Sequence, residues 1–178
     1  MTAQIHDTFI FKREKYSLIG KKGDDLVSPE QFGMRPEMLS TCCYRGFYTT
    51  YELTKTGLYL RELTLREKDR NYLPINGVLP EKKEHTASYH NLSVQVPFSG
   101  KIRLAKDFIQ ELYIHMGYQK PTAFKTIYDV TLENGRVIEL KDRSKEMEEK
   151  RGAFKRHYES GNIIQTIKEA FSLDIDFE

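Results

Sequence analysis

The chain has 178 residues, of which 39% are hydrophobic and 30% charged, and its formal net charge is +2 at pH 7. This length favours one domain with a core that needs no metal or disulfide, and the composition excludes a disordered chain. No apolar run approaches the roughly 20 residues that span a bilayer, and basic residues alternate with acidic ones, so neither a membrane nor nucleic acid is an expected partner.

The N-terminal residues 1–7 lack the basic patch and apolar stretch of a secretory signal. The two cysteines, Cys42 and Cys43, are neighbours, and Cα atoms about 3.8 Å apart are too close for an unstrained disulfide. We therefore expect reduced thiols and a cytoplasmic location.

The first predicted elements are two short strands, 9–11 and 16–19, which form a hairpin. A strand follows from residue 42 to residue 53. In the strand that follows the turn at Gly57, the leucines move from one face of the strand to the other. This change predicts a β-bulge near residues 61–62.

One pattern occurs three times, at residues 51–60, 92–104 and 128–140. Each copy has an alternating run, a polar turn that ends in glycine, and a second alternating run. Because side chains on a strand alternate between faces, each copy predicts a β-hairpin.

Two intervening segments are less regular. Residues 68–88 predict a long, partly apolar loop with a turn at Asn76-Gly77. Residues 107–116 fit either a helix with a capping box or an alternating strand, and their place between two predicted hairpins favours the strand.

After residue 140 the apolar residues recur at the spacing that is typical of helices. Residues 144–158 predict a mostly solvated helix, and residues 162–171 predict a second helix with a broad apolar face. Residues 173–178 alternate strictly, which predicts an edge strand in this chain or in a partner.

The predicted fold is mainly β: a strongly curved antiparallel meander or up-and-down barrel of about eight strands, with a C-terminal helical appendix. Residues 1–142 would form the barrel or curved sheet, and residues 143–178 would form helices and an acidic tail packed on it. A curved two-sheet sandwich is the alternative.

The most informative site candidate is Arg45, which shares the phase of Phe47 and Tyr51 if residues 43–53 form one regular strand. A buried guanidinium needs a carboxylate, carbonyl groups or an anionic ligand. A bulge at Gly46, or a guanidinium that reaches water at the rim, is the more ordinary interpretation.

His90 is in phase with the apolar residues of 92–98, so it is expected to face the interior or its rim. A histidine held by one backbone hydrogen bond is the more common case. Asp142 could be the counter-charge of Arg45, but a cap on the following helix is preferred.

A catalytic pair of Cys42 or Cys43 with His115 is weakly indicated, because no nucleophile elbow or oxyanion loop accompanies the thiols. His85 and His90 have the spacing of half a zinc site, but adjacent cysteines do not complete it. No metal and no cofactor are therefore expected.

Three function classes stay open. The first is a non-catalytic protein that binds a small anionic or amphipathic ligand in the concavity of the sheet. Arg45 and His90 would be its polar anchors, Phe47 and Tyr51 its walls, and the loop 68–88 its rim or lid. The second is a protein-interaction module, of the inhibitor or immunity type, acting through residues 162–178 on a partner or a second copy. A cysteine- and histidine-dependent enzyme comes third.

Overall fold

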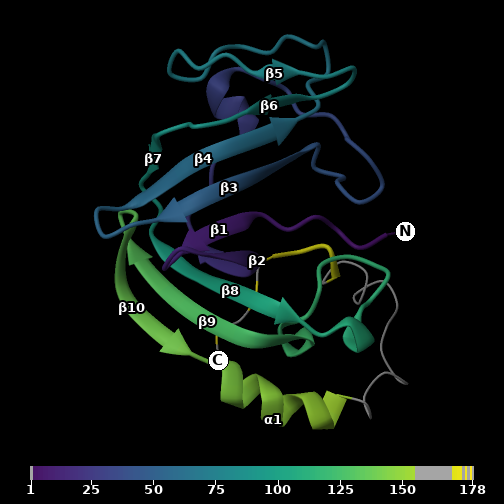
Figure 1. Ribbon diagram of the computed structural model, residues 1–178, viewed down its shortest axis with the longest axis vertical. Helices are drawn as coiled ribbons and strands as arrows, with labels where there is room; N and C mark the ends of the chain where they lie inside the picture. The colour runs from purple at the N-terminus through teal and green to yellow at the C-terminus, as the bar shows by residue number, and fades with distance from the viewer. Residues whose placement is uncertain (1, 155–169, 174, 176, 178) are drawn as a thin grey trace.

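The computed structural model describes residues 2–154, 170–173, 175 and 177, which are mainly β. The strands are β1 (Thr8–Phe11), β2 (Glu14–Gly23), β3 (Phe47–Leu53), β4 (Leu58–Leu65), β5 (Glu81–Lys82), β6 (Ala87–Tyr89), β7 (Val94–Val96), β8 (Gly100–Phe108), β9 (Phe124–Glu133) and β10 (Arg136–Asp142). These ten strands form one sheet in the order β10-β9-β8-β2-β1-β3-β4-β6-β5, with β7 beside β4. The sheet curves strongly and is not closed (Figure 1), which confirms the predicted mainly β, curved-sheet class.

Local sequence signals determine two turns and one β-bulge. The turns Lys12-Arg13 and Asn134-Gly135 have positive φ at both residues, as two-residue hairpin turns require. Between β3 and β4, Thr50 faces Glu62 and Tyr51 faces Leu60, so Arg61 is an extra residue. The bulge predicted at 61–62 is therefore confirmed.

The hairpin predicted at 92–104 is wrong. β7 pairs with β4, and β8 pairs with β2 and β9. Gly100 lies opposite Gly23, and a Cβ atom at Gly100 would collide with the carbonyl oxygen of Lys22. This glycine therefore permits a close approach of two strands, rather than marking a turn between them.

β1 joins the two halves of the sheet and departs from a simple meander. It pairs antiparallel with β2 and parallel with β3, so that Thr8 faces both Ser17 and Thr50. Because β1 starts at Thr8, which faces Ser17, the later residues of β2 have no neighbour from β1.

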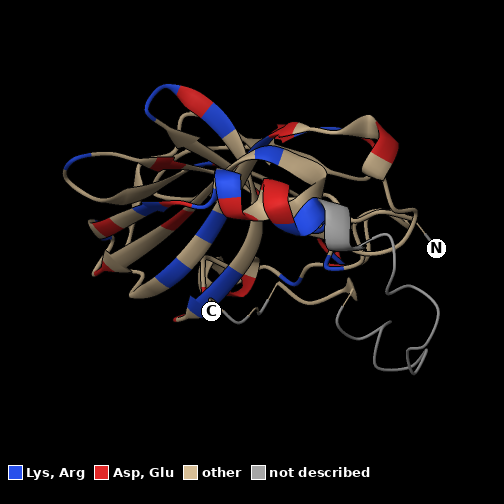
Figure 2. Cartoon of the chain, turned by 90° about the horizontal axis from the view of Figure 1, so that it is seen from below, with Lys and Arg blue, Asp and Glu red and all other residues tan. Residues whose placement is uncertain are grey.

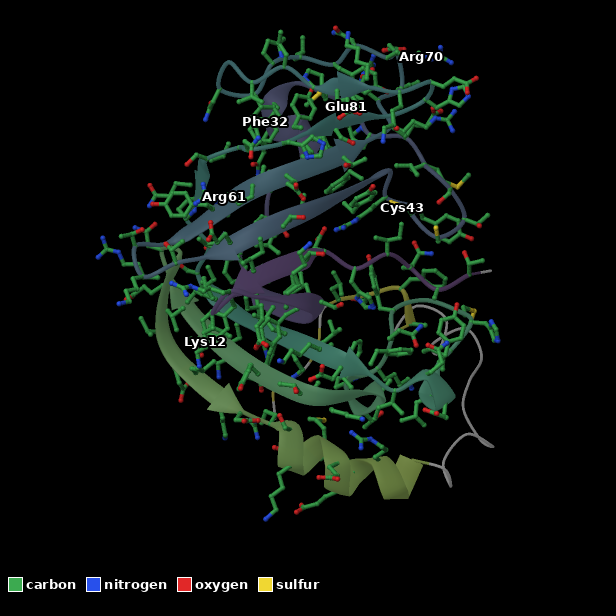
Figure 3. The ribbon with its side chains drawn as sticks, viewed as in Figure 1. Lys12, Phe32, Cys43, Arg61, Arg70 and Glu81 are labelled. Atoms are coloured by element: carbon green, nitrogen blue, oxygen red, sulfur yellow. The ribbon has the colours of Figure 1, made fainter. Side chains whose placement is uncertain are left out.

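The concave face of the sheet is a packed core. Its largest side chains, Tyr51, Tyr89, Phe9 and Phe98, are at most 1% exposed, and Figure 3 shows side chains crowded between the strands. At one end, the β9–β10 turn meets β4 and β7, since a Cβ atom at Gly135 would lie 2.6 Å from the carbonyl oxygen of Val96.

The predicted loop at 68–88, which contains β5 and the start of β6, closes part of this core. Ile75 is 1% exposed, and the Tyr89 hydroxyl donates a 2.6 Å hydrogen bond to the carbonyl oxygen of Leu73. The loop start is also fixed, because Glu67 accepts hydrogen bonds from the backbone N–H groups of Asp69 and Asn71.

After β8, the chain forms a short 3-10 turn, Gln110–Leu112, so the strand predicted over 107–116 is wrong beyond Phe108. Two similar turns are Pro29–Phe32 and Pro121–Ala123. None of the helices within the described residues has the length and apolar character to cross a membrane.

Helix α1 (Ser144–Phe154) packs along β9, and charges of both signs alternate around it (Figure 2). Asp142 Oδ1 accepts a 2.9 Å hydrogen bond from the backbone N–H of Ser144, so its predicted capping role is confirmed. The second predicted helix, 162–171, lies outside the described residues except for its last two. The division of the chain at residue 142 stays a prediction.

Candidate functional site

The candidate site lies beside the later residues of β2, which follow Ser17 and have no neighbour from β1. Residues 170–173, 175 and 177, here called the C-terminal segment, pass through this region (Figure 1, yellow). Lys21 N–H donates to the carbonyl oxygen of Leu173 at 2.6 Å, and Ile175 N–H donates to that of Lys21 at 3.3 Å. The alternating tail therefore pairs with a strand of its own chain at these residues.

Two glycines allow the C-terminal segment to lie close to the sheet. A Cβ atom at Gly20 would collide with the side chain of Ile175, and one at Gly117 would collide with the carbonyl oxygen of Ala170. That same oxygen accepts a 2.7 Å hydrogen bond from the backbone N–H of Tyr118. The ring of Phe171 packs against Tyr44, with the two centroids 5.7 Å apart.

Asp7 and Arg45 form a largely buried ion pair beside this segment. The Asp7 side chain is 3% exposed, and it accepts hydrogen bonds from Arg45 Nη1 at 2.8 Å and from Arg45 Nη2. It also accepts hydrogen bonds from the Thr49 N–H at 2.8 Å and the Thr49 hydroxyl at 2.6 Å. Arg45 Nε donates to the carbonyl oxygen of Phe47 at 2.8 Å. Burial alone would lower the pKa of Arg45, but the charge and hydrogen bonds of Asp7 raise it above its ordinary value.

The strand geometry assumed for Arg45 is wrong. Residues 44–46 form a turn, Gly46 has a φ of 81°, and β3 begins at Phe47. Arg45 therefore approaches the core from a turn, and its counter-charge is Asp7 instead of Asp142. A guanidinium already paired with a carboxylate is a poor anchor for an anionic ligand.

Phe47 and Tyr51 have different environments. Phe47 is partly buried, and the guanidinium of Arg45 stacks on its ring at 4.7 Å. Tyr51 is 0% exposed, its hydroxyl donates to the carbonyl oxygen of Val27 at 3.5 Å, and burial raises its pKa. Tyr51 is thus a core residue instead of the wall of a ligand site.

His90 does not face the interior, the first of the two positions expected for it. Its side chain is 49% exposed, with Nδ1 3.2 Å from Glu62 and Nε2 3.9 Å from Glu81, which is labelled in Figure 3. Asn91 has a φ of 55°, and this left-handed residue breaks the alternation counted back from Leu92. The structure therefore separates His90 from Arg45, Phe47 and Tyr51.

Three of the cavities formed by the described residues border the C-terminal segment. The largest, of about 520 Å³, lies between Ile19, the loop residues 113–121, and Ala170, Ser172 and Ile175. A second, of about 380 Å³, is lined by Gln4, Tyr44, Arg45, Tyr118 and Phe171. The third, of about 300 Å³, includes Asp7, Arg45, Phe47 and Leu173 in its lining.

His6 is a partly buried polar group that sequence reasoning missed. Its Nδ1 lies 2.9 Å from the carbonyl oxygen of Leu18, and its ring centroid is 5.2 Å from that of Tyr118. Its Nε2 is buried without a hydrogen-bond partner among the described residues. Burial lowers the pKa of His6, which favours the neutral ring. No local pattern marks His6 or Asp7, because both precede the first strand.

The cysteines have the environment of structural thiols. The Cys43 thiol, at the end of the sheet where β3 begins (Figure 3), donates to the carbonyl oxygen of Phe47 at 3.3 Å. Burial raises the pKa of Cys43, the opposite of what an activated nucleophile needs. His115 packs against Tyr113, and within the described part of the chain neither thiol is hydrogen-bonded to it. The same residues contain no cluster of three side chains suited to a metal ion.

Comparisons of the chain with family models, curated proteins and solved structures find no match. Any functional proposal must therefore come from the geometry of the site.

Proposed function

We propose that this protein is a non-catalytic binding protein that holds one small amphipathic, anionic ligand in the 520 Å³ cavity beneath the C-terminal segment. The observation that carries the proposal is the lining of this cavity, where apolar side chains from Ile19, Met116 and Ile175 meet Lys120 and His115. Binding sites for small molecules typically measure about 300–1,000 Å³ and combine apolar walls with a few polar groups.

The cavity replaces the concave face of the sheet as the proposed site, because the core fills that face. Lys120 lines the cavity and would supply positive charge to an anionic group bound there. Interaction with a protein through residues 162–178 receives less support, since Leu173 and Ile175 already pair with Lys21 in the same chain.

Isothermal titration calorimetry with dodecanoate and with dodecyltrimethylammonium would test the proposal. These two probes have the same alkyl chain and opposite charges. We expect saturable one-to-one binding of dodecanoate and weaker binding of the cationic probe. Lys120→Met should reduce this preference, because the cavity then loses its cationic side chain. Equal binding of both probes, or no saturable binding, would overturn the proposal.

A matched pair of variants locates the site. Met116→Trp places an indole in the cavity and should weaken dodecanoate binding about tenfold or more, equivalent to about 1.4 kcal/mol. Met38→Trp makes the same change at a residue that is 48% exposed and does not line this cavity, so its affinity should equal that of the wild type. Equal affinities of the two variants would place the ligand elsewhere. Native mass spectrometry of the purified protein would show whether a ligand copurifies.

A further inference from the structure

β10 is an edge strand with its outer side uncovered by the described residues. Among the described strands it pairs only with β9, and all seven of its residues, Arg136–Asp142, are exposed. Three of them are apolar: Val137 is 37% exposed, Ile138 61% and Leu140 38%. Unpaired strand edges with apolar side chains readily pair with another strand, and natural proteins normally protect them.

The part of the β9 edge that β10 does not reach is protected by other residues. The first half of β9 faces α1, and Ile127 there donates its N–H to Ser144 Oγ at 3.0 Å and accepts from the Arg143 N–H at 2.9 Å. Arg151 Nη2 donates to the carbonyl oxygen of Phe124 at 2.9 Å. The described residues therefore cover this part of the β9 edge and leave the edge of β10 open.

The direction of the backbone groups in β10 follows from these contacts. The N–H and C=O groups of Ile127 both point toward α1, so those of Asp129, two residues later, point to its partner Lys141. Leu140 is adjacent to Lys141 in β10. Because backbone groups alternate in direction along a strand, those of Leu140 point to the open edge.

The charges of β10 favour a second copy of the same strand in one register. If the two Leu140 residues lie opposite each other in an antiparallel pair, Glu139 of each copy faces Lys141 of the other. A two-fold axis at Glu139 or at Lys141 would place like charges opposite each other, and one at Asp142 would pair two aspartates. Opposite charges across a strand pair stabilise it by about 0.2–1 kcal/mol, and like charges destabilise it.

We propose that β10 pairs antiparallel with β10 of a second copy around Leu140, so that the protein forms a weak symmetric dimer. The paired region, residues 138–142, is short because α1 begins at Ser144 and the bulge lies between Val137 and Glu139. An interface of this size falls below that of stable dimers, so the association is expected only at high protein concentration.

Sedimentation velocity of the full chain, from about 5 to about 500 µM, tests the proposal with a charge-exchange cycle. Wild type should form dimers as its concentration rises. Glu139→Lys and Lys141→Glu should each weaken association about tenfold, because each places like charges opposite each other. The double variant should regain wild-type association, since the exchanged charges again attract.

Two control variants make the same charge changes at exposed positions far from β10. Glu84→Lys and Lys83→Glu, between β5 and β6 at the other end of the strand order, should leave the association unchanged, and circular dichroism checks that every variant is folded. A wild type that is monomeric at all concentrations would overturn the proposal. So would a dimer insensitive to both single exchanges, or a double variant that associates no better than the singles.

Discussion

Asp7 binds the guanidinium of Arg45 and the backbone N–H of Thr49, and so ties the start of β1 to the start of β3. Thr49 directly precedes Thr50, which faces Thr8 in the parallel pair of these strands. Parallel pairing has no hairpin turn to fix its register. The Asp7–Arg45 pair therefore helps to fix the register in which β1 and β3 pair.

Arg45→Met should lower the free energy of unfolding by about 3–5 kcal/mol, because it leaves the buried Asp7 carboxylate without its counter-charge. Arg35→Met is the matched control: Arg35 pairs with Asp69, but the side chains of both are more than half exposed. Its cost should be below about 1 kcal/mol. Urea denaturation measures both values. An equal loss of unfolding free energy in the two variants would show that the Asp7–Arg45 pair stabilises the fold no more than an exposed ion pair does.

Gly117→Ala should displace the C-terminal segment, since the new methyl group would collide with the carbonyl oxygen of Ala170. Gly77→Ala is the control, because Gly77 has a similar φ, +80° against +74°, but open space around its Cβ position. Both variants bear a similar backbone strain of about 1 kcal/mol. Only Gly117→Ala should accelerate hydrogen exchange at the Lys21 N–H, which bonds to Leu173. Unchanged exchange at Lys21 would contradict this docking.

Much of the fold could be predicted from the sequence because its signals are local. The turn at Asn134-Gly135 and the extra residue at Arg61 are specified by neighbouring residues. By contrast, Gly100 resembles a turn glycine but serves a close approach between strands. The parallel pairing of β1 and β3 joins segments about 40 residues apart, and no alternation pattern indicates it.

The site was harder to predict, because single residues with positive φ interrupt strand alternation. Gly46 and Asn91 do so beside Arg45 and His90, and the phase counted across them is wrong in both cases. Asp7 lies 38 residues from its partner Arg45. The cavity beneath the C-terminal segment is formed by residues from distant parts of the chain, which only the tertiary structure brings together.

His6 should make stability depend on pH near neutrality. Burial lowers its pKa below the ordinary value of 6.5; Asp7 opposes this shift and Arg45 adds to it. Between the lowered pKa and 6.5, the unfolded chain binds more protons, so the free energy of unfolding rises with pH. This stabilisation is complete above pH 6.5 and is lost as the pH falls below it.

Urea denaturation between pH 5.5 and 8 measures this effect. The contribution of His6 to the slope should not exceed about 1.4 kcal/mol per pH unit, the limit for one proton. His6→Asn should flatten the dependence, whereas His85→Asn should preserve it, because the side chain of His85 is 56% exposed. A wild-type slope retained in His6→Asn would assign the pH dependence to other groups.

Arg151 should stabilise the sheet by covering the edge of β9. Its Nε and Nη2 atoms donate to the carbonyl oxygens of Thr122 and Phe124, both at 2.9 Å. Arg151→Ala removes both donors and should lower the free energy of unfolding by about 1–3 kcal/mol, as expected for buried acceptors left unpaired. Lys150→Ala removes only an exposed pair with Glu146 and should cost less than about 0.5 kcal/mol. If the two variants unfold at the same urea concentration, the contacts of Arg151 do not stabilise this edge. The protection of β9 must then come from the backbone N–H of Arg143 and the hydroxyl of Ser144.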